Sequence, residues 1–318
     1  MTHHISFPKL GNIAFDIDPV AFEFGPLSIR WYGIIICLGF VLAGLYAFKR
    51  CRSFDTTVDD IVDFLICLIP CAIIGARLYY VFSCWDYYGK HPEQIIKVWE
   101  GGLAIYGGII LGVIAAIIFS KVKKIDFFNF GDMAVICIFI GQLIGRWGNF
   151  VNAEAFGAIT NLPWGMSING AAPCHPTFLY ESLWNLAGFI FTHFYSRRRR
   201  FKGEIILIYF GWYGLGRAWI EGLRTDSLYL GSTDIRVSQL LAAVSFVVCA
   251  SLLVYLHVSK RYKTISFLTL EKQACEAEIC SCADASEETA ETEETAEKAE
   301  TETEKGETAE AETKQTEQ

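Results

Sequence analysis

The sequence predicts an all-α integral membrane protein, a bundle of seven transmembrane helices, and three observations support this fold class. Apolar residues make up 53% of the chain and charged residues only 19%, which is outside the usual composition of soluble proteins. Apolar stretches long enough to cross a bilayer recur along the sequence. Basic residues, in addition, collect beside every second stretch.

The seven apolar stretches each approach the roughly 20 residues that a helix needs to cross a bilayer. They cover residues 31–48, 61–82, 103–120, 128–144, 178–195, 204–220 and 238–257. Thirty residues precede the first stretch, and its basic flank lies on the wrong side for a cleavable signal peptide. We therefore expect residues 1–263 to form one transmembrane domain.

The distribution of basic residues predicts the orientation. Fourteen of them follow the first, third, fifth and seventh stretches: Lys49, Arg50, Arg52, Lys121, Lys123, Lys124, Arg197, Arg198, Arg199, Arg200, Lys202, Lys260, Arg261 and Lys263. Only six lie on the opposite side. Because basic loops stay in the cytoplasm, we expect the N-terminus outside and the C-terminus inside. A short cytoplasmic loop also explains YSRRRRFK (195–202) better than a nucleic-acid site does.

Residues 264–318 form an acidic segment of different composition. They hold 17 Asp/Glu and 4 Lys, against 18 Asp/Glu and 23 Lys/Arg in the rest of the chain. Imperfect repeats of Glu, Thr and Ala bury too little apolar surface to offset chain entropy, so we expect a disordered cytoplasmic tail. Its three cysteines lack a fourth metal ligand, and the chain contains neither a P-loop nor HExxH. No metal or cofactor is expected. Cys84 and Cys174 both fall on the outer side, where a disulfide is conceivable.

Polar residues next to the late apolar stretches point to function, since a charge at mid-bilayer costs about 2.5–3.5 kcal/mol even on lenient scales. In YFGWYGLGRAWIEGLRTD, the residues Tyr213, Arg217, Glu221 and Arg224 are spaced by four, four and three and would share one helical face. Glu221 could simply neutralise an arginine on a packing face. Two arginines against one glutamate nevertheless leave a positive surplus, which favours an anion such as phosphate.

A second polar segment, GRWGNFVNAEAFG (145–157), follows an unbroken apolar run. It places Arg146 at the same membrane face as Arg217, with Asn149 as an amide donor and Glu154 as an acceptor or a partner for arginine. Its glycines, including Gly157, permit close approach of the backbone. HPTFLYE (175–181) then re-enters the membrane. These features predict an arginine-lined pocket in the outer leaflet for an anionic phospholipid.

The same segment resembles the signature of the prolipoprotein diacylglyceryl transferases, Gly-Arg-x-Gly-Asn-Phe-x-Asn-x-Glu-x-x-Gly. Every fixed position of that pattern is present. Supporting motifs follow in the expected order over about residues 20–260: RWYG, GAR, GGLAIYGG, HPTxLYE and YGxxRxxxExxR. The similarity therefore covers all seven predicted apolar stretches.

The resemblance implies an enzyme of the bacterial cytoplasmic membrane whose active site faces the outer leaflet. Such enzymes move the diacylglyceryl group of phosphatidylglycerol to the lipobox cysteine of a prolipoprotein signal peptide, forming a thioether and releasing glycerol 1-phosphate. A lipid flippase or transporter would also use intramembrane arginines, but it predicts inverted repeats and broken helices near the midplane. The sequence contains no such repeat, and its intramembrane charges lie toward one leaflet.

The resemblance also assigns residues. The catalytic set is Arg146, Arg217, Tyr106 and Glu221, and the phospholipid-binding set is Arg146, Asn149, Arg224, Tyr32, Tyr213, Glu154 and Gly157. Tyr106 departs from the family, because many members have a histidine there that has been assigned as the base. A tyrosine with a pKa near 10 is a poor base at neutral pH. Tyr106 either positions a substrate or acts as a base under the influence of nearby cations.

Overall fold

The computed structural model describes residues 2–25, 27–224, 236–260 and 262. These residues belong to a single unit that spans Met1–Ser266. The predicted acidic tail, residues 264–318, and its cysteines lie outside the described residues. Residues 225–235, which follow Arg224, also lie outside them.

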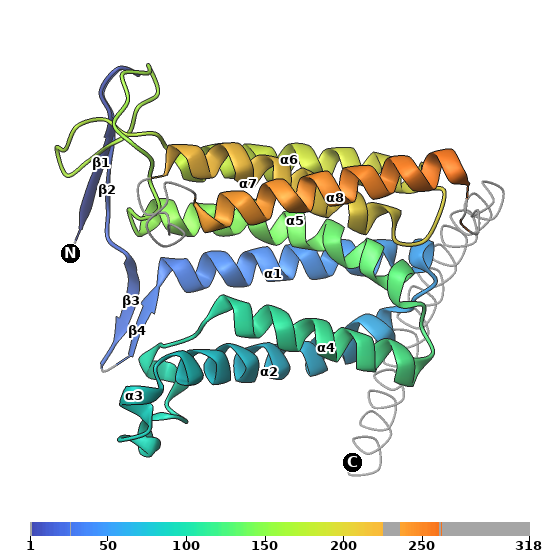
Figure 1. Ribbon diagram of the computed structural model, residues 1–318. Helices are drawn as coiled ribbons and strands as arrows, with labels where there is room; N and C mark the ends of the chain where they lie inside the picture. Colours follow the sequence, from blue (N-terminus) through green and yellow to red (C-terminus); the bar gives the residue numbers. More distant parts are fainter. Residues whose placement is uncertain (1, 26, 225–235, 261, 263–318) are drawn as a thin grey trace, which may run out of the picture. The chain divides into compact units, whose positions relative to one another are not determined.

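Long helices dominate the described part of the chain (Figure 1). They are α1 (Trp31–Arg50), α2 (Val58–Ser83), α4 (Ile105–Lys123), α5 (Phe127–Val151), α6 (Thr177–Tyr195), α7 (Glu204–Ile220) and α8 (Val237–Ser259). Each corresponds to one predicted apolar stretch. Shorter helical segments connect them: Cys51–Phe54, α3 (Trp85–Tyr88), Pro92–Gln94, Val98–Glu100, Ser196–Arg198 and Glu221–Leu223.

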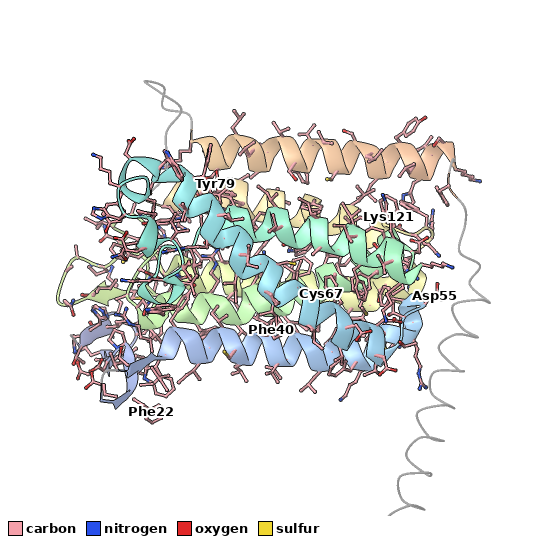
Figure 2. All side chains as sticks on the ribbon, turned by 90° about the horizontal axis from the view of Figure 1, so that it is seen from below. Phe22, Phe40, Asp55, Cys67, Tyr79 and Lys121 are labelled. Atoms are coloured by element: carbon pink, nitrogen blue, oxygen red, sulfur yellow. The ribbon has the colours of Figure 1, made fainter. Side chains whose placement is uncertain are left out.

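Five of the long helices are long and apolar enough to cross a membrane: α1, α2, α4, α5 and α8. The other two are more polar or shorter, since α6 carries Glu181 and Asn185 in its buried face and α7 has only 17 residues. Large apolar side chains are exposed along the spans, including Ile66 on α2 and Phe40 on α1 (Figure 2). Such a surface suits hydrocarbon rather than water, so the chain is a mostly helical, multi-pass membrane protein.

Two small antiparallel sheets accompany the helices. One has the order β2–β1–β5, with β1 at His3–Phe7, β2 at Ile13–Ile17 and β5 at Ser167–Ile168. The other pairs β3 (Val20–Phe24) with β4 (Leu27–Arg30). The sequence patterns predict none of these strands, because all of them are short and because the two-residue β5 forms only by pairing with the distant β1, where Ile168 lies opposite Ile5. The fold therefore departs from a purely α-helical one at this end of the bundle.

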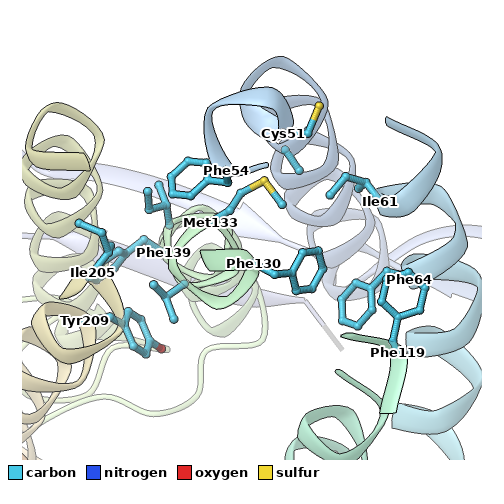
Figure 3. Packing of buried hydrophobic residues seen from close by; sticks show 13 residues of the cluster. Cys51, Phe54, Ile61, Phe64, Phe119, Phe130, Met133, Phe139, Ile205 and Tyr209 are labelled. Atoms are coloured by element: carbon cyan, nitrogen blue, oxygen red, sulfur yellow. The ribbon is translucent and has the colours of Figure 1, made fainter. Parts of the chain in front are cut away.

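The core forms around α5, which packs against α1, α6 and α7. Its buried face contributes Phe130, Met133 and Phe139 (Figure 3). The ring of Phe130 meets Phe64 of α2 at 4.8 Å between centroids, and Phe139 meets Tyr209 of α7 at 4.9 Å. Two further helix pairs pack closely, α2 with α4 and α7 with α8.

The helical unit has two chemically different ends. Both sheets lie at one end of the helices (Figure 1), which we call the strand end. Here α5 ends, α6 begins and α7 ends. At the opposite, basic end lie the predicted basic clusters at the ends of α1, α4 and α6, together with Lys260 directly after α8. Here Asp132 accepts hydrogen bonds from Arg199 Nη1 at 3.0 Å and from the backbone N–H of Gly203 at 2.9 Å. This buried pair caps α7 and fixes the basic loop before it.

Candidate active site

A single carboxylate, that of Glu181, joins three arginines at the strand end. Arg146 comes from α5, Glu181 from α6 and Arg217 from α7, while Arg224 follows the short helix after α7. Arg146 Nη2 forms an ion pair with Glu181 Oε2. Oε1 of the same carboxylate lies 3.5 Å from Arg217 Nη1 and 3.7 Å from Arg224 Nη1. Segments distant in the sequence thus converge on one cationic cluster.

The cluster is largely withdrawn from solvent but not closed. The Glu181 side chain is 7% exposed, whereas those of Arg146, Arg217 and Arg224 are 24%, 18% and 12% exposed. The cations therefore form the accessible edge of the cluster and the carboxylate its interior. An anion that approaches from the accessible edge meets guanidinium groups first.

Glu221 gives Arg217 a second acidic partner. Arg217 Nη2 lies 2.7 Å from Glu221 Oε2, one helical turn further along. The ion pair considered in the sequence analysis is therefore present, although Arg217 also faces Glu181. The expectation that Arg224 shares the helical face of Arg217 is wrong. The helix α7 ends at Ile220, and Arg224 has an extended backbone beyond a 3-10 turn.

Tyr213, the first member of the predicted stripe, lies beside the core. Its ring stacks on Tyr209 at 6.1 Å and packs against the main hydrophobic cluster. Among the described contacts none joins Tyr213 to Arg217. The structure thus places Tyr213 at the hydrophobic core and not among the arginines of the cationic cluster.

Hydrogen bonds within the signature segment run from Arg146 through Asn149 to Glu154. Arg146 Nη1 donates to Asn149 Oδ1 at 3.3 Å, and Asn149 Nδ2 donates to Glu154 Oε1 at 2.9 Å. Asn152 Nδ2 reaches the same Glu154 oxygen at 3.4 Å. Of the two roles considered for Glu154, the structure shows the acceptor, because it orients the asparagine that in turn orients Arg146.

Gly157 links the signature segment to Arg224. The two residues form an isolated β-bridge, and the Gly157 N–H donates to His175 O at 2.9 Å. A Cβ atom at position 157 would lie 2.7 Å from the Cβ of His175 and 2.8 Å from the carbonyl oxygen of Leu223. Both distances are shorter than real contacts allow. Only glycine lets the backbone that carries Arg224 come this close.

Tyr32, at the start of α1, packs against the same signature. A Cβ at Gly148 would lie 2.6 Å from Tyr32 Cδ2, so the glycine makes room for the ring next to the last turns of α5. The Tyr32 side chain is still 38% exposed. It therefore lies at the accessible margin of the segment that carries Arg146 and Asn149.

Tyr106 lies apart from the arginines. It is 63% exposed on the first turn of α4, and its ring is 6.2 Å from that of Tyr79 on α2. The helix α4 packs mainly on α2, whereas α7 packs on α5, α6 and α8. The packing therefore does not place Arg217 on a helix next to Tyr106. No contact among the described residues joins the two.

Arg77 fixes the segment that leads to Tyr106. Its buried guanidinium donates to five backbone carbonyls, those of Gln94, Ile95, Lys97, Gly101 and Gly102, at 2.6–3.3 Å. A Cβ at Gly102, where φ is +73°, would lie 2.6 Å from Arg77 Nη1. The motifs GAR and GGLAIYGG are therefore in contact, because Arg77 of the first donates to the carbonyls of Gly101 and Gly102 in the second.

Comparison with known proteins identifies the family of the chain. Residues 19–255 match the family described as prolipoprotein diacylglyceryl transferase. The chain belongs to the prolipoprotein diacylglyceryl transferase family. It is 46% identical to the phosphatidylglycerol–prolipoprotein diacylglyceryl transferase of Streptococcus agalactiae serotype Ia over 249 residues, which cover 75% of this chain and 96% of that protein. The enzymes of that name from Listeria welshimeri and Listeria monocytogenes serotype 4a are 46% and 44% identical, covering 77% and 78% of this chain and 92% and 93% of theirs.

The site of this prolipoprotein diacylglyceryl transferase family member contains one residue without a role in the sequence analysis. Glu181 appears there only as part of HPTFLYE, yet it contacts all three arginines of the cluster. An ionisable residue inside an apolar helix is by default a functional candidate, and this signal was available. The thiols of Cys84 and Cys174 are both free. Burial raises the pKa of the Cys174 thiol, which donates to Met166 O.

Proposed function

We propose that this chain transfers the diacylglyceryl group of phosphatidylglycerol to the thiol of the lipobox cysteine in prolipoproteins, the first step of lipoprotein maturation. The observation that carries the proposal is the convergence of Arg146, Arg217 and Arg224 on one buried carboxylate. Names of the relatives supply the lipid and the protein substrate. The arginine cluster supplies a physical reason for an anionic lipid.

The reaction is a displacement at the glyceryl carbon. The cysteine sulfur forms a bond to this carbon as the carbon–oxygen bond to the phosphate breaks, and the bonding pair remains on the phosphate oxygen. The thiol loses its proton, and the former ester oxygen, now a terminal oxygen of the phosphate in glycerol 1-phosphate, can take up that proton. Negative charge therefore grows on the departing phosphate, and preorganised cations lower the barrier at that point.

Arg146 and Arg217 hold the phosphate in this proposal, with Arg224 beside them. Planar guanidinium groups offer paired donors that fit phosphate oxygens. Glu221 orients Arg217 and Asn149 orients Arg146 through the contacts described above. A free thiol has a pKa of about 8.5 and is only slightly ionised at neutral pH. The positive field of the arginines favours its thiolate, and Tyr106 positions a substrate at the start of α4.

The proposed setting is the bacterial cytoplasmic membrane, with the strand end at its outer face. An external N-terminus and a cytoplasmic location of residues 264–318 follow from the basic clusters at the opposite end, and the seven long helices of the described residues are the proposed spans. Partners are then phosphatidylglycerol, signal peptides with a lipobox cysteine and the surrounding lipids. The chemistry as written involves no nucleic acid and no cofactor.

A reconstituted transfer assay tests the proposal. Purified protein is mixed with phosphatidylglycerol vesicles and a lipobox peptide, and a peptide with serine in place of cysteine serves as the control. We expect a thioether-linked lipidated peptide and an equal amount of glycerol 1-phosphate from the cysteine peptide alone. A lipid flippase would produce neither, and that result would refute the proposal.

A further inference from the structure

The contacts of Glu181 are not those of an ordinary ion pair, because one carboxylate serves three arginines. Arg146 holds Oε2, while Arg217 and Arg224 share Oε1 at 3.5 Å and 3.7 Å. These two distances exceed the 2.7–3.2 Å or so of a typical N–H···O hydrogen bond. Glu181 therefore keeps Arg217 and Arg224 close to one another without fixing either.

The arginines have other groups that orient them. Arg217 is held by Glu221 at 2.7 Å, and Arg146 donates to Asn149 at 3.3 Å. The backbone of Arg224 is held by its bridge to Gly157. Removal of the Glu181 charge would leave these contacts in place. Glu181 is therefore needed for the charge balance of the cluster more than for its geometry.

Carboxylate and phosphate compete for the same guanidinium groups, because both accept paired N–H donors. Like charges brought together without an anion repel one another. We propose that Glu181 is a placeholder: its carboxylate neutralises the arginines before lipid binds, yields to the phosphate of the lipid, and returns as the phosphate leaves. This role rests on the proposed function and makes Glu181 a positioning residue, since it acts through the arginines.

The placeholder matters most for product release. The phosphodiester of the lipid carries one negative charge, whereas a phosphate monoester carries about 1.5–2 at neutral pH. Glycerol 1-phosphate therefore binds three arginines more strongly than the lipid phosphate does. A carboxylate that competes for these arginines weakens the product complex. Without that competition, the product would leave slowly.

Glu181→Gln tests this role because it removes the charge and keeps the size of the side chain. Binding of glycerol 1-phosphate is measured by calorimetry on the purified, detergent-solubilised full chain. We expect the variant to bind about tenfold tighter than the wild type or better, a gain of about 1.4 kcal/mol. In the transfer assay, both kcat and the KM for phosphatidylglycerol should fall. Unchanged or weaker binding by a folded variant would overturn the placeholder role.

Glu204→Gln provides the matched control. Glu204 is a fully buried glutamate at the basic end, where it accepts a hydrogen bond from Tyr195 Oη at 2.6 Å. Its substitution should leave the affinity for glycerol 1-phosphate unchanged. If Glu181→Gln does not fold, binding is measured with Glu181→Asp instead, because its shorter carboxylate competes less well with phosphate for the arginines. Tighter binding than in the wild type supports the role, and equal or weaker binding refutes it.

The binding measurement does not depend on turnover. A wild-type protein without transfer activity would refute the proposed function, yet a gain in affinity for Glu181→Gln would still establish competition between Glu181 and phosphate. A wild-type protein with transfer activity and no such gain would refute the placeholder role alone. The two failures are thus distinguishable.

Discussion

Gly157→Ala should impair the enzyme although it adds only a single methyl group. The new Cβ would lie 2.7 Å from His175 Cβ and 2.8 Å from Leu223 O, against the 3.0 Å that real Cβ contacts respect. Leu223 immediately precedes Arg224, whose backbone bridges Gly157. The strain would therefore shift the segment that carries Arg224 by a few tenths of an ångström or more.

The substitution should lower both the stability and the transfer rate. Overpacking of this kind costs about 1–3 kcal/mol of stability. Misplacement of a catalytic group by about 1 Å can cost 10²-fold in rate, so a smaller shift should lower kcat/KM on the order of tenfold. The measurements are thermal unfolding in detergent and transfer from phosphatidylglycerol to a lipobox peptide.

Gly141→Ala is the matched control for this prediction. Gly141 lies in α5, and a Cβ there would meet nothing within 4 Å. Its substitution should leave the transfer rate unchanged and should not lower the unfolding temperature. If Gly157→Ala kept both the wild-type rate and the wild-type stability, the steric account of the Gly157–Arg224 bridge would be wrong.

Three further predictions concern residues outside the arginine cluster. Tyr106→Phe should reduce transfer by up to about tenfold, because a positioning hydrogen bond contributes about 0.5–1.5 kcal/mol; an inactive Phe variant rescued by Tyr106→His would instead identify Tyr106 as a base. Arg77→Lys should lower the unfolding temperature, because an ammonium group with three donors cannot replace a guanidinium that contacts five carbonyls. Each carbonyl left without a donor costs about 1–3 kcal/mol. An unchanged unfolding temperature would contradict this prediction. Removal of residues 271–318 should preserve transfer, because the family match ends at residue 255; an inserted but inactive truncated protein would contradict it.

The helices could be predicted because each one carries a local signal. The stretches 31–48 and 204–220, for example, reappear as α1 and α7. Most strands form local hairpins, β1 with β2 and β3 with β4, which are too short to stand out in the sequence, and β5 depends on pairing of Ile168 with the distant Ile5. A pattern that extends over a few residues contains no information about such a distant partner.

The candidate site could also be predicted only in part. Arg146 and Arg217 could be assigned from motifs, and both lie in the cluster. The role of Glu181 could not be assigned, because its partners come from α5, α7 and the segment beyond α7 and meet only in the fold. The motif of Tyr106 likewise does not reveal its neighbours, because the packing of α4 on α2 that places it beside Tyr79 appears only in the fold.

The transfer rate of Arg217→Ala tests the central claim most directly, namely that the arginine cluster stabilises the departing phosphate. Loss of one preorganised donor at a developing charge costs about 10²–10³ in kcat, or about 2.7–4 kcal/mol. Arg198→Ala, which removes an exposed arginine from the basic loop at the opposite end, is the control and should keep the wild-type rate. We predict a loss of this size for Arg217→Ala in a folded, membrane-inserted protein. A rate within a few-fold of the control would contradict the account.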